Sequence, residues 1–286
     1  MNKGYCSDLN SSQKKLQKFP IGVFDSGVGG LTVLKSLYQR LPNESFLYFG
    51  DTKRVPYGTR SQAEIVEFVR QILTWMVQEQ VKMAIMACNT SSALALEIVR
   101  TEFDLPILGI ILPGARAAVQ TGKRIGVIAT PATVNSESYP QAIQEINPEA
   151  KVWQVGCPKF VPLIEQNQIA APQTLAVVYE YLQPLLDARI DTLVYGCTHY
   201  PHLEPVISQI LPRSVSQVDP AQHLAAAAAR ELELLGLSQT QRGQQSTRFC
   251  VSGCPNQFAQ TSQQWLGELP VVENITLPVP TPSALA

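Results

Sequence analysis

IGVFDSGVGGLTVL, residues 21–34, is the stretch that decides the fold class. Its apolar run at 21–24 is typical of a buried strand, and the polar, glycine-rich DSGVGG that follows ends that strand. A helical pattern then covers residues 31–41. A strand that passes through a glycine-rich loop into a helix is the repeating unit of α/β proteins.

The same alternation continues along the rest of the chain. Apolar runs predict strands, and apolar residues that recur on one helical face predict helices. The predicted strands are 21–24, 46–49, 83–87, 125–129, 152–155, 192–195 and 248–251, and the predicted helices are 31–41, 62–77, 91–100, 175–186, 222–235 and 256–266. Near-continuous apolar strands indicate parallel sheets covered on both faces, so the predicted fold class is α/β.

The composition is that of a globular protein. The chain has 286 residues, 45% of them hydrophobic and 16% charged, and a net charge of −1. This balance excludes a disordered chain and argues against a polybasic protein that binds nucleic acid or a membrane surface.

The two ends of the chain differ from the rest. Residues 1–20 are polar, without the apolar core of a secretory signal, and are expected to be a disordered lead. Residues 277–286 are expected to be a loose tail. We therefore expect a cytoplasmic protein with free thiols.

Two halves of the sequence resemble each other. AIMACNTSSALAL around Cys88 has a counterpart in TLVYGCTHYPHLE around Cys197, and IGVFDSGVGGLTV has a weaker one in IGVIATPATVN. The intervals from the first Ile of each half to its Cys are 67 and 72 residues. This pattern predicts two similar α/β domains facing one another across a cleft, with chance similarity of two βα units as the alternative.

Polar loops follow the predicted strands, where ligands of open parallel sheets bind. They begin at Asp25, Asp51, Cys88, Thr130 and Cys197. The positive end of a following helix favours a substrate carboxylate and is expected to lower the pKa of a thiol. Two thiols on opposite walls of a cleft suit proton transfer at a stereocentre, one as base and one as acid.

Each of these residues also has a structural explanation. A cysteine at a strand end is commonly a small buried apolar residue. Asp25 and His199 are placed to assist the two thiols, but Asp25 could instead cap a helix and His199 could be a polar core residue.

Five segments carry a specific resemblance. FDSGVGGLTVL, YFGDTKRVPYGTRS, ACNTSSA, CPKFVPLIE and YGCTHYPHL, in this order, resemble the glutamate racemase family of the aspartate/glutamate racemase superfamily. The resemblance runs from about Ile21 to Phe258. It implies cofactor-independent interconversion of L- and D-glutamate, which supplies D-glutamate for peptidoglycan, and a homodimer.

The resemblance also implies the domain organisation and the roles of individual residues. Residues 21–113 and 220–276 form one α/β domain and residues 114–219 a second, related to it by pseudo-twofold symmetry. Cys88 acts on the D-enantiomer and Cys197 on the L-enantiomer, assisted by Asp25 and His199. The positions that correspond to substrate-binding groups are Asp25, Ser26, Tyr57, Gly58, Asn89, Thr90, Thr198 and His199, with Glu165 near the second thiol and Thr133 as a weaker match.

Several other functions stay open from the sequence. A dinucleotide-binding loop would need glycine at Thr32, and a zinc hydrolase would need Cys197, His199 and His202 within six residues. A thiol hydrolase would use one of the two cysteine loops, and a clamshell binding protein would need neither thiol. An aspartate racemase would keep both thiols and change the side-chain pocket. We expect no metal site, because Cys250 and Cys254 supply only two ligands. Cys157 is expected to pack near the site without reacting.

Overall fold

The computed structural model describes residues 14–239 and 245–278 and contains two parallel sheets. The first has the strand order β10-β9-β2-β1-β3-β4 and the second β6-β5-β7-β8. The first-sheet strands are β1 (Ile21–Asp25), β2 (Phe46–Gly50), β3 (Met83–Met86), β4 (Ile107–Gly109), β9 (Thr247–Val251) and β10 (Val272–Asn274). The second-sheet strands are β5 (Arg124–Ala129), β6 (Lys151–Gly156), β7 (Thr192–Gly196) and β8 (Ser216–Val218).

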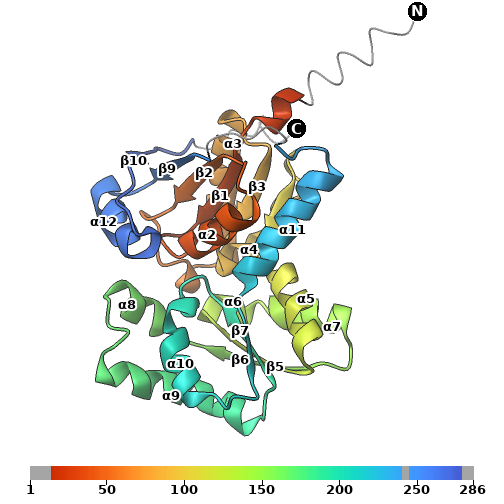
Figure 1. Cartoon of the computed structure of the whole chain (residues 1–286), viewed down its shortest axis with the longest axis vertical. Coiled ribbons are helices and arrows are strands. Elements are labelled where there is room, and N and C mark those ends of the chain that lie inside the picture. The colour runs from red at the N-terminus through yellow and green to blue at the C-terminus, as the bar shows by residue number, and fades with distance from the viewer. Residues whose placement is uncertain (1–13, 240–244, 279–286) are drawn as a thin grey trace, which may run out of the picture.

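Helices cover the sheets and connect their strands (Figure 1). They are α2 (Leu31–Arg40), α3 (Gln62–Gln78), α4 (Asn89–Val99), α5 (Ile111–Thr121), α6 (Pro131–Asn135), α7 (Ser138–Ile146), α8 (Phe160–Glu165), α9 (Pro172–Asp187), α10 (Glu204–Ile210), α11 (Pro220–Leu234) and α12 (Pro255–Leu266), with 3-10 turns η1 (Tyr57–Thr59) and η2 (Tyr200–Leu203). The predicted α/β class is confirmed.

The strand order supports the predicted repeat. β1 pairs with β2 and β3, and β3 pairs with β4; β5 pairs with β6 and β7, and β7 pairs with β8. The four strands β1–β4 therefore have the same order as β5–β8. The strands β9 and β10 join the first sheet, so the chain leaves that sheet and later returns to it.

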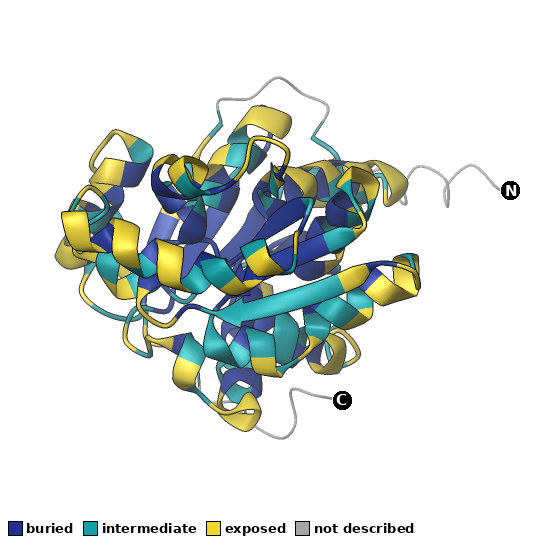
Figure 2. Cartoon of the chain, turned by 90° about the horizontal axis from the view of Figure 1, so that it is seen from below, coloured by how far each residue is buried: buried dark blue, intermediate teal, exposed yellow. Residues whose placement is uncertain are grey.

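Both faces of the strands β1, β2 and β3 in the first sheet are buried, with alternate side chains on opposite faces. Ile21 and Val23 of β1 belong to an apolar cluster shared with α2 and α11, whereas Phe24 belongs to another shared with α3 and α4. Figure 2 shows dark-blue strands enclosed by helices whose outward faces are yellow. Within the described residues, no helix combines the length and apolar character needed to cross a bilayer.

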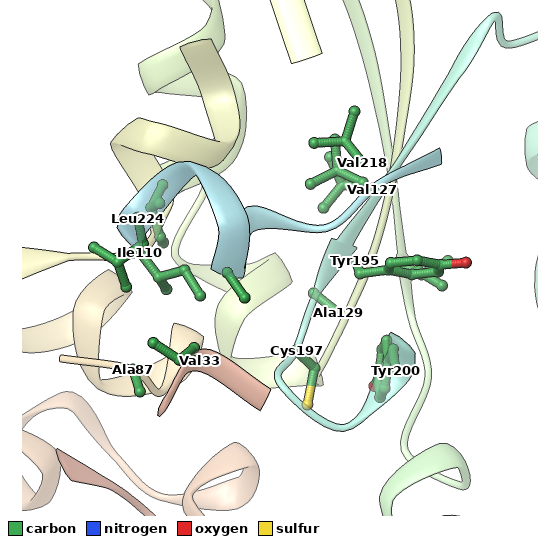
Figure 3. Packing of buried hydrophobic residues seen from close by; sticks show 14 of the residues in the cluster. Val33, Ala87, Ile110, Val127, Ala129, Tyr195, Cys197, Tyr200, Val218 and Leu224 are labelled. Atoms are coloured by element: carbon green, nitrogen blue, oxygen red, sulfur yellow. The ribbon is translucent and has the colours of Figure 1, made fainter. Parts of the chain in front are cut away.

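The larger apolar cluster extends through both sheets. It includes Val33 and Ala87 on the side of the first sheet and Val127 and Ala129 on β5. In Figure 3, Ile110 and Leu224 lie on the side of Val33 and Ala87, across from Val127 and Ala129. The two sheets are thus joined by apolar packing as well as by the chain.

Two segments where the sequence suggested a break or disorder are helical. Pro113-Gly114, where the sequence suggested a break between the halves, lies in the first turn of α5, a position that tolerates proline because the N–H groups there have no helical partner. The domain limits at 113/114 and 219/220 stay predictions. Residues 14–17 are helical, and the carbonyl of Gln17 accepts a hydrogen bond from the buried Lys82, so this part of the expected lead is ordered. Residues 1–13 and 279–286 lie outside the described part.

Candidate active site

The loops at the strand ends of both sheets line one cavity of about 740 Å³. The sequence-predicted residues that line it are Ser26, Tyr57, Gly58, Cys88, Asn89, Thr90, Glu165, Cys197, Thr198 and His199. Asp25 and Thr133 are buried behind this lining, with 1% and 0% of their surfaces exposed. Both thiols therefore reach one cavity, one at the end of β3 and the other at the end of β7, which hold equivalent places in the two sheets.

The first thiol, Cys88, stands at the N-terminal end of α4. Its Sγ lies 3.9 Å from the Ser26 Oγ. Burial, and next the negative charge of Asp25, raise the pKa of Cys88 to about 12. The expectation that the helix end lowers this pKa is therefore wrong for Cys88, because loss of water around a buried thiolate outweighs the helix dipole. Cys88 is a protonated thiol near neutral pH.

The second thiol, Cys197, follows β7 and lies beside His199. The distance from the Cys197 Sγ to the His199 Nδ1 is 3.8 Å, and the His199 Nε2 is 3.0 Å from the Glu165 Oε1. Burial alone would lower the pKa of His199, but the contacts with Cys197 and Glu165 and the charge of Asp25 raise it to about 10. His199 is therefore an imidazolium at neutral pH, and its positive charge stabilises negative charge on the Cys197 sulfur.

Asp25 connects the two halves at the last residue of β1. Its Oδ1 accepts a hydrogen bond from the Gly27 N–H at 2.9 Å, and its Oδ2 accepts one from the Thr198 hydroxyl at 3.2 Å. Burial raises the pKa of Asp25, and the charge of His199 opposes that rise. Asp25 is not the N-cap of α2, since Gly30 holds that position without a side-chain cap.

Two glycines allow loops of the two halves to meet. A Cβ atom on Gly29 would lie 2.4 Å from the Thr198 Oγ1 and 2.5 Å from the His199 Nδ1, and one on Gly58 would lie 2.9 Å from the Thr130 Cβ. The Thr32 hydroxyl donates to the Thr198 carbonyl at 3.2 Å. The glycine-rich loop thus packs against the loop of the second thiol, which argues against a dinucleotide at this position.

The remaining predicted binding residues differ in what their polar atoms contact. The Asn89 side chain accepts a hydrogen bond from the Tyr139 hydroxyl at 2.7 Å, while its buried Nδ2 has no partner within residues 14–239 and 245–278. The Thr90 hydroxyl lies 2.9 Å from that of Thr130 and 3.2 Å from that of Thr133. The Tyr57 hydroxyl donates to Asp51, so it faces a buried carboxylate of its own loop. Among the described residues, the Asn89 Nδ2 donor therefore has no partner, whereas the Tyr57 hydroxyl has one.

Sequence reasoning missed the contribution of α12 to this cavity. Four residues at or within this helix line it, namely Cys254, Gln257, Phe258 and Thr261. The only signal in the sequence was the last predicted helix, 256–266, because nothing in its residue types points to chemistry. Cys157 also lines the cavity, and burial raises its pKa.

Metal-ligand geometry is missing from the part of the chain that the structure describes. No group of three or more His, Cys, Asp or Glu side chains there is arranged to hold an ion. His202, a possible third ligand beside Cys197 and His199, instead packs on Trp265 with 3.9 Å between ring centres. Cys250 is fully buried in the first-sheet core, and Cys254 is exposed.

Comparison with known proteins gives a consistent result. The sequence model of the family described as Asp/Glu/Hydantoin racemase matches residues 21–228. A glutamate racemase from Gloeothece citriformis is 65% identical over 273 residues, covering 96% of this chain and 98% of its own. The crystal structure of a glutamate racemase isoform from Bacillus anthracis aligns with a TM-score of 0.88 at 36% identity, covering 92% of this chain and 100% of its own.

A Francisella tularensis glutamate racemase, solved in complex with D-glutamate, aligns with a TM-score of 0.86 at 37% identity, covering 91% of this chain and 98% of its own. These similarities agree with the resemblance carried by the cysteine loops. The extent of the family match and the identity to curated relatives lead to one conclusion: the chain belongs to the Asp/Glu/Hydantoin racemase family.

Proposed function

We propose that this chain interconverts L- and D-glutamate by two proton transfers at the α-carbon. The observation that carries the proposal is the pair of thiols at equivalent strand ends of two sheets with the same strand order, both lining one cavity. Each thiol has its own titratable neighbour, Asp25 for Cys88 and His199 for Cys197. A racemase needs this arrangement, because one group removes the proton and another returns it from the opposite face.

The burial of Cys88 gives this thiol the role of the acid when L-glutamate is bound. With L-glutamate bound, the Cys197 thiolate takes the α-proton and leaves the electron pair on the α-carbon. The Cys88 thiol then donates its proton to the other face, which yields D-glutamate, a Cys197 thiol and a Cys88 thiolate. The reverse reaction uses the same groups in opposite roles. His199 stabilises the thiolate at Cys197, and burial keeps Cys88 protonated until it donates.

The substrate is held by polar groups that surround the thiols. The unused Nδ2 donor of Asn89 suits a substrate carboxylate, and the hydroxyls of Ser26, Thr90 and Thr198 lie in the same lining. Gly58 lets the loop that follows Asp51 approach Thr130 and so closes one side of the cavity. Glu165 acts on the substrate through His199 rather than by direct contact. The supply of D-glutamate for peptidoglycan, the cytoplasmic location and the homodimer stay predictions.

The test is purified protein with L-glutamate in D₂O and no added cofactor, followed by NMR and optical rotation. We expect loss of rotation with deuterium entering the α-position, and no effect of a chelator. Cys88→Ala and Cys197→Ala should each abolish racemisation, since either loss leaves one face without a proton donor or acceptor. Wild-type turnover in both directions by either variant would contradict the two-thiol mechanism.

Two other outcomes would redirect the assignment. Racemisation of aspartate in place of glutamate would make the chain an aspartate racemase. Tight binding of glutamate without any exchange would make it a binding protein that shares the fold.

A further inference from the structure

Trp265 lies on α12 one helical turn beyond Thr261, which lines the cavity. Only 4% of its surface is exposed. Figure 1 shows α12 (blue) on the side of the first sheet that faces α8. Neither the motifs nor the proposed mechanism assigns this tryptophan a role, yet its indole contacts two histidines of the second half.

The indole packs against His199 and His202 in different geometries. The His199 ring meets it edge-on, with 5.5 Å between centroids and an interplanar angle of 84°. The His202 ring lies closer, at 3.9 Å and 59°. The backbone carbonyl of Trp265 accepts a hydrogen bond from the Lys35 Nζ at 3.1 Å, which ties the end of α12 to α2. Trp265 is therefore held from both halves of the molecule.

His199 needs a restraint of this kind. Its Nδ1 faces the Cys197 sulfur and its Nε2 faces Glu165. The imidazole can turn about its Cβ–Cγ bond, and the 3.8 Å contact between Nδ1 and the Cys197 sulfur restrains that rotation only weakly. An indole packed edge-on beside the imidazole opposes the rotation. The charge that stabilises the Cys197 thiolate is effective only while Nδ1 keeps its direction, because electrostatic stabilisation depends on preorganised geometry.

We propose that Trp265 is a positioning residue for the Cys197 half of the reaction, which it serves by fixing the ring orientation of His199. The inference rests on the proposed racemase activity. His202 supports the indole as a neutral ring, since burial and the charges of His199 and Lys35 lower its pKa to about 4. An uncharged ring can pack closely beside Trp265 without repelling the His199 cation.

The test compares Trp265→Leu, which keeps apolar volume, with Trp265→Phe, which keeps an aromatic ring. Trp153→Leu is the matched control, because Trp153 lies on β6 under the Arg124 guanidinium and does not line the cavity. We expect kcat/KM to fall about 10- to 100-fold in both directions for Trp265→Leu, as small misplacements of catalytic groups do. Trp265→Phe should keep most of the activity, and the control should match wild type.

The deciding measurement is the kinetic isotope effect with each α-deuterated enantiomer. If the Cys197 step alone is slowed, the isotope effect on kcat/KM rises for L-glutamate, whose α-bond breaks at Cys197, and falls for D-glutamate. A merely structural loss lowers the amount of active protein and leaves both isotope effects unchanged. Unchanged isotope effects in a folded Trp265→Leu protein, or full activity, would overturn the proposal.

A second readout does not depend on turnover. In ¹⁵N-histidine NMR spectra, the ring signals of His199 should broaden or split in Trp265→Leu as the imidazole gains a second orientation, and should stay single in Trp153→Leu. If wild-type protein fails to racemise glutamate, the proposed function fails, and these spectra still decide the positioning role. His199 signals identical to those of wild type would then reject it.

Discussion

His199 and His202 stand three residues apart but have opposite protonation preferences. Hydrogen bonds to Cys197 and Glu165 overcome burial and raise the pKa of His199 to about 10, whereas burial and the charges of His199 and Lys35 lower that of His202 to about 4. The chain has only three histidines, so NMR titration with ¹³C-labelled histidine can resolve each ring. We expect His199 to stay protonated at pH 8 and His202 to stay neutral at pH 6. A His199 midpoint below 6.5 would contradict the imidazolium at Cys197.

This pKa shift carries a stability consequence with a definite sign. The pKa of His199 in the folded state lies above the value of about 6.5 expected in the unfolded chain. The stabilisation is therefore fully present below pH 6.5 and is lost as the pH rises through about 10. We expect the difference in free energy of unfolding between wild type and His199→Gln to shrink from pH 6 to pH 10, measured by urea denaturation. A difference that grows over this range would contradict the assignment.

Asn89 is the residue whose change should alter binding rather than proton transfer. Its buried Nδ2 has no partner in the part of the chain that the structure describes, while its Oδ1 accepts a hydrogen bond from Tyr139. Asn89→Asp keeps the Tyr139 contact, turns the free donor into an acceptor and adds a negative charge that repels the substrate carboxylate. We expect the KM for glutamate to rise at least about 10-fold, since loss of one hydrogen bond to a charged group has that effect by itself, with kcat changed much less.

The control for this change is Tyr139→Phe, which removes the hydroxyl that donates to the Asn89 Oδ1 and leaves the Nδ2 donor in place. It should lower stability and spare KM. An unchanged KM in Asn89→Asp would mean that the donor does not face the substrate.

At the scale of the element, Asp51 organises the loop that carries Tyr57 and Gly58. Its buried carboxylate accepts hydrogen bonds from the Arg54 Nε at 2.6 Å, the Ser252 hydroxyl at 2.7 Å and the Tyr57 hydroxyl. Tyr57→Phe removes one of three donors without touching the cavity side of the loop. We expect a loss of about 1–3 kcal/mol in the free energy of unfolding and less than about a 10-fold change in kcat/KM. A much larger loss of activity at unchanged stability would place the hydroxyl on the substrate.

The same loop shows which features of the site can be predicted from the sequence and which cannot. Strands and the first thiol loop are predictable, because apolar runs and their polar ends are local signals. The direction of the Tyr57 hydroxyl depends on Ser252 and Arg54 converging on Asp51, and Ser252 is distant in sequence. The contribution of α12 was missed for the same reason, since ordinary residues such as Gln257 and Thr261 gain a role only by position. The thiol pKa of Cys88 was mistaken because burial is a property of the folded molecule.

Short elements were missed for a different reason. The three-residue strands β4 and β10 are too short for alternation to stand out. In α5, the pair Pro113-Gly114 is typical of a helix break, but the helix continues through it. Gly114 packs closely against Pro220 at the start of α11. Both segments that connect the two sheets therefore touch at one place.

At the scale of the whole molecule, the two halves are joined by three kinds of contact. One apolar cluster runs through both sheets, the hydroxyls of Thr90, Thr130 and Thr133 form a cluster across the boundary, and Thr198 donates to Asp25. Thr90, Thr130 and Thr198 of the polar contacts line the cavity. Figure 3 shows part of the apolar cluster. Neither sheet can unfold alone without exposing apolar surface that the other covers.

This arrangement predicts that the two halves unfold together. Trp153 lies in the second sheet, while Trp75 and Trp265 belong to helices that cover the first. In a Trp153→Phe/Trp265→Phe protein, fluorescence comes from Trp75 of the first half, because Trp265 contacts His199 and His202 of the second. Far-UV circular dichroism reports both halves. We expect the two signals to give the same midpoint in urea, as a single cooperative transition requires. A fluorescence midpoint displaced from that of the dichroism would show that the apolar cluster does not couple the sheets. The cavity between them would then be able to open without loss of either core.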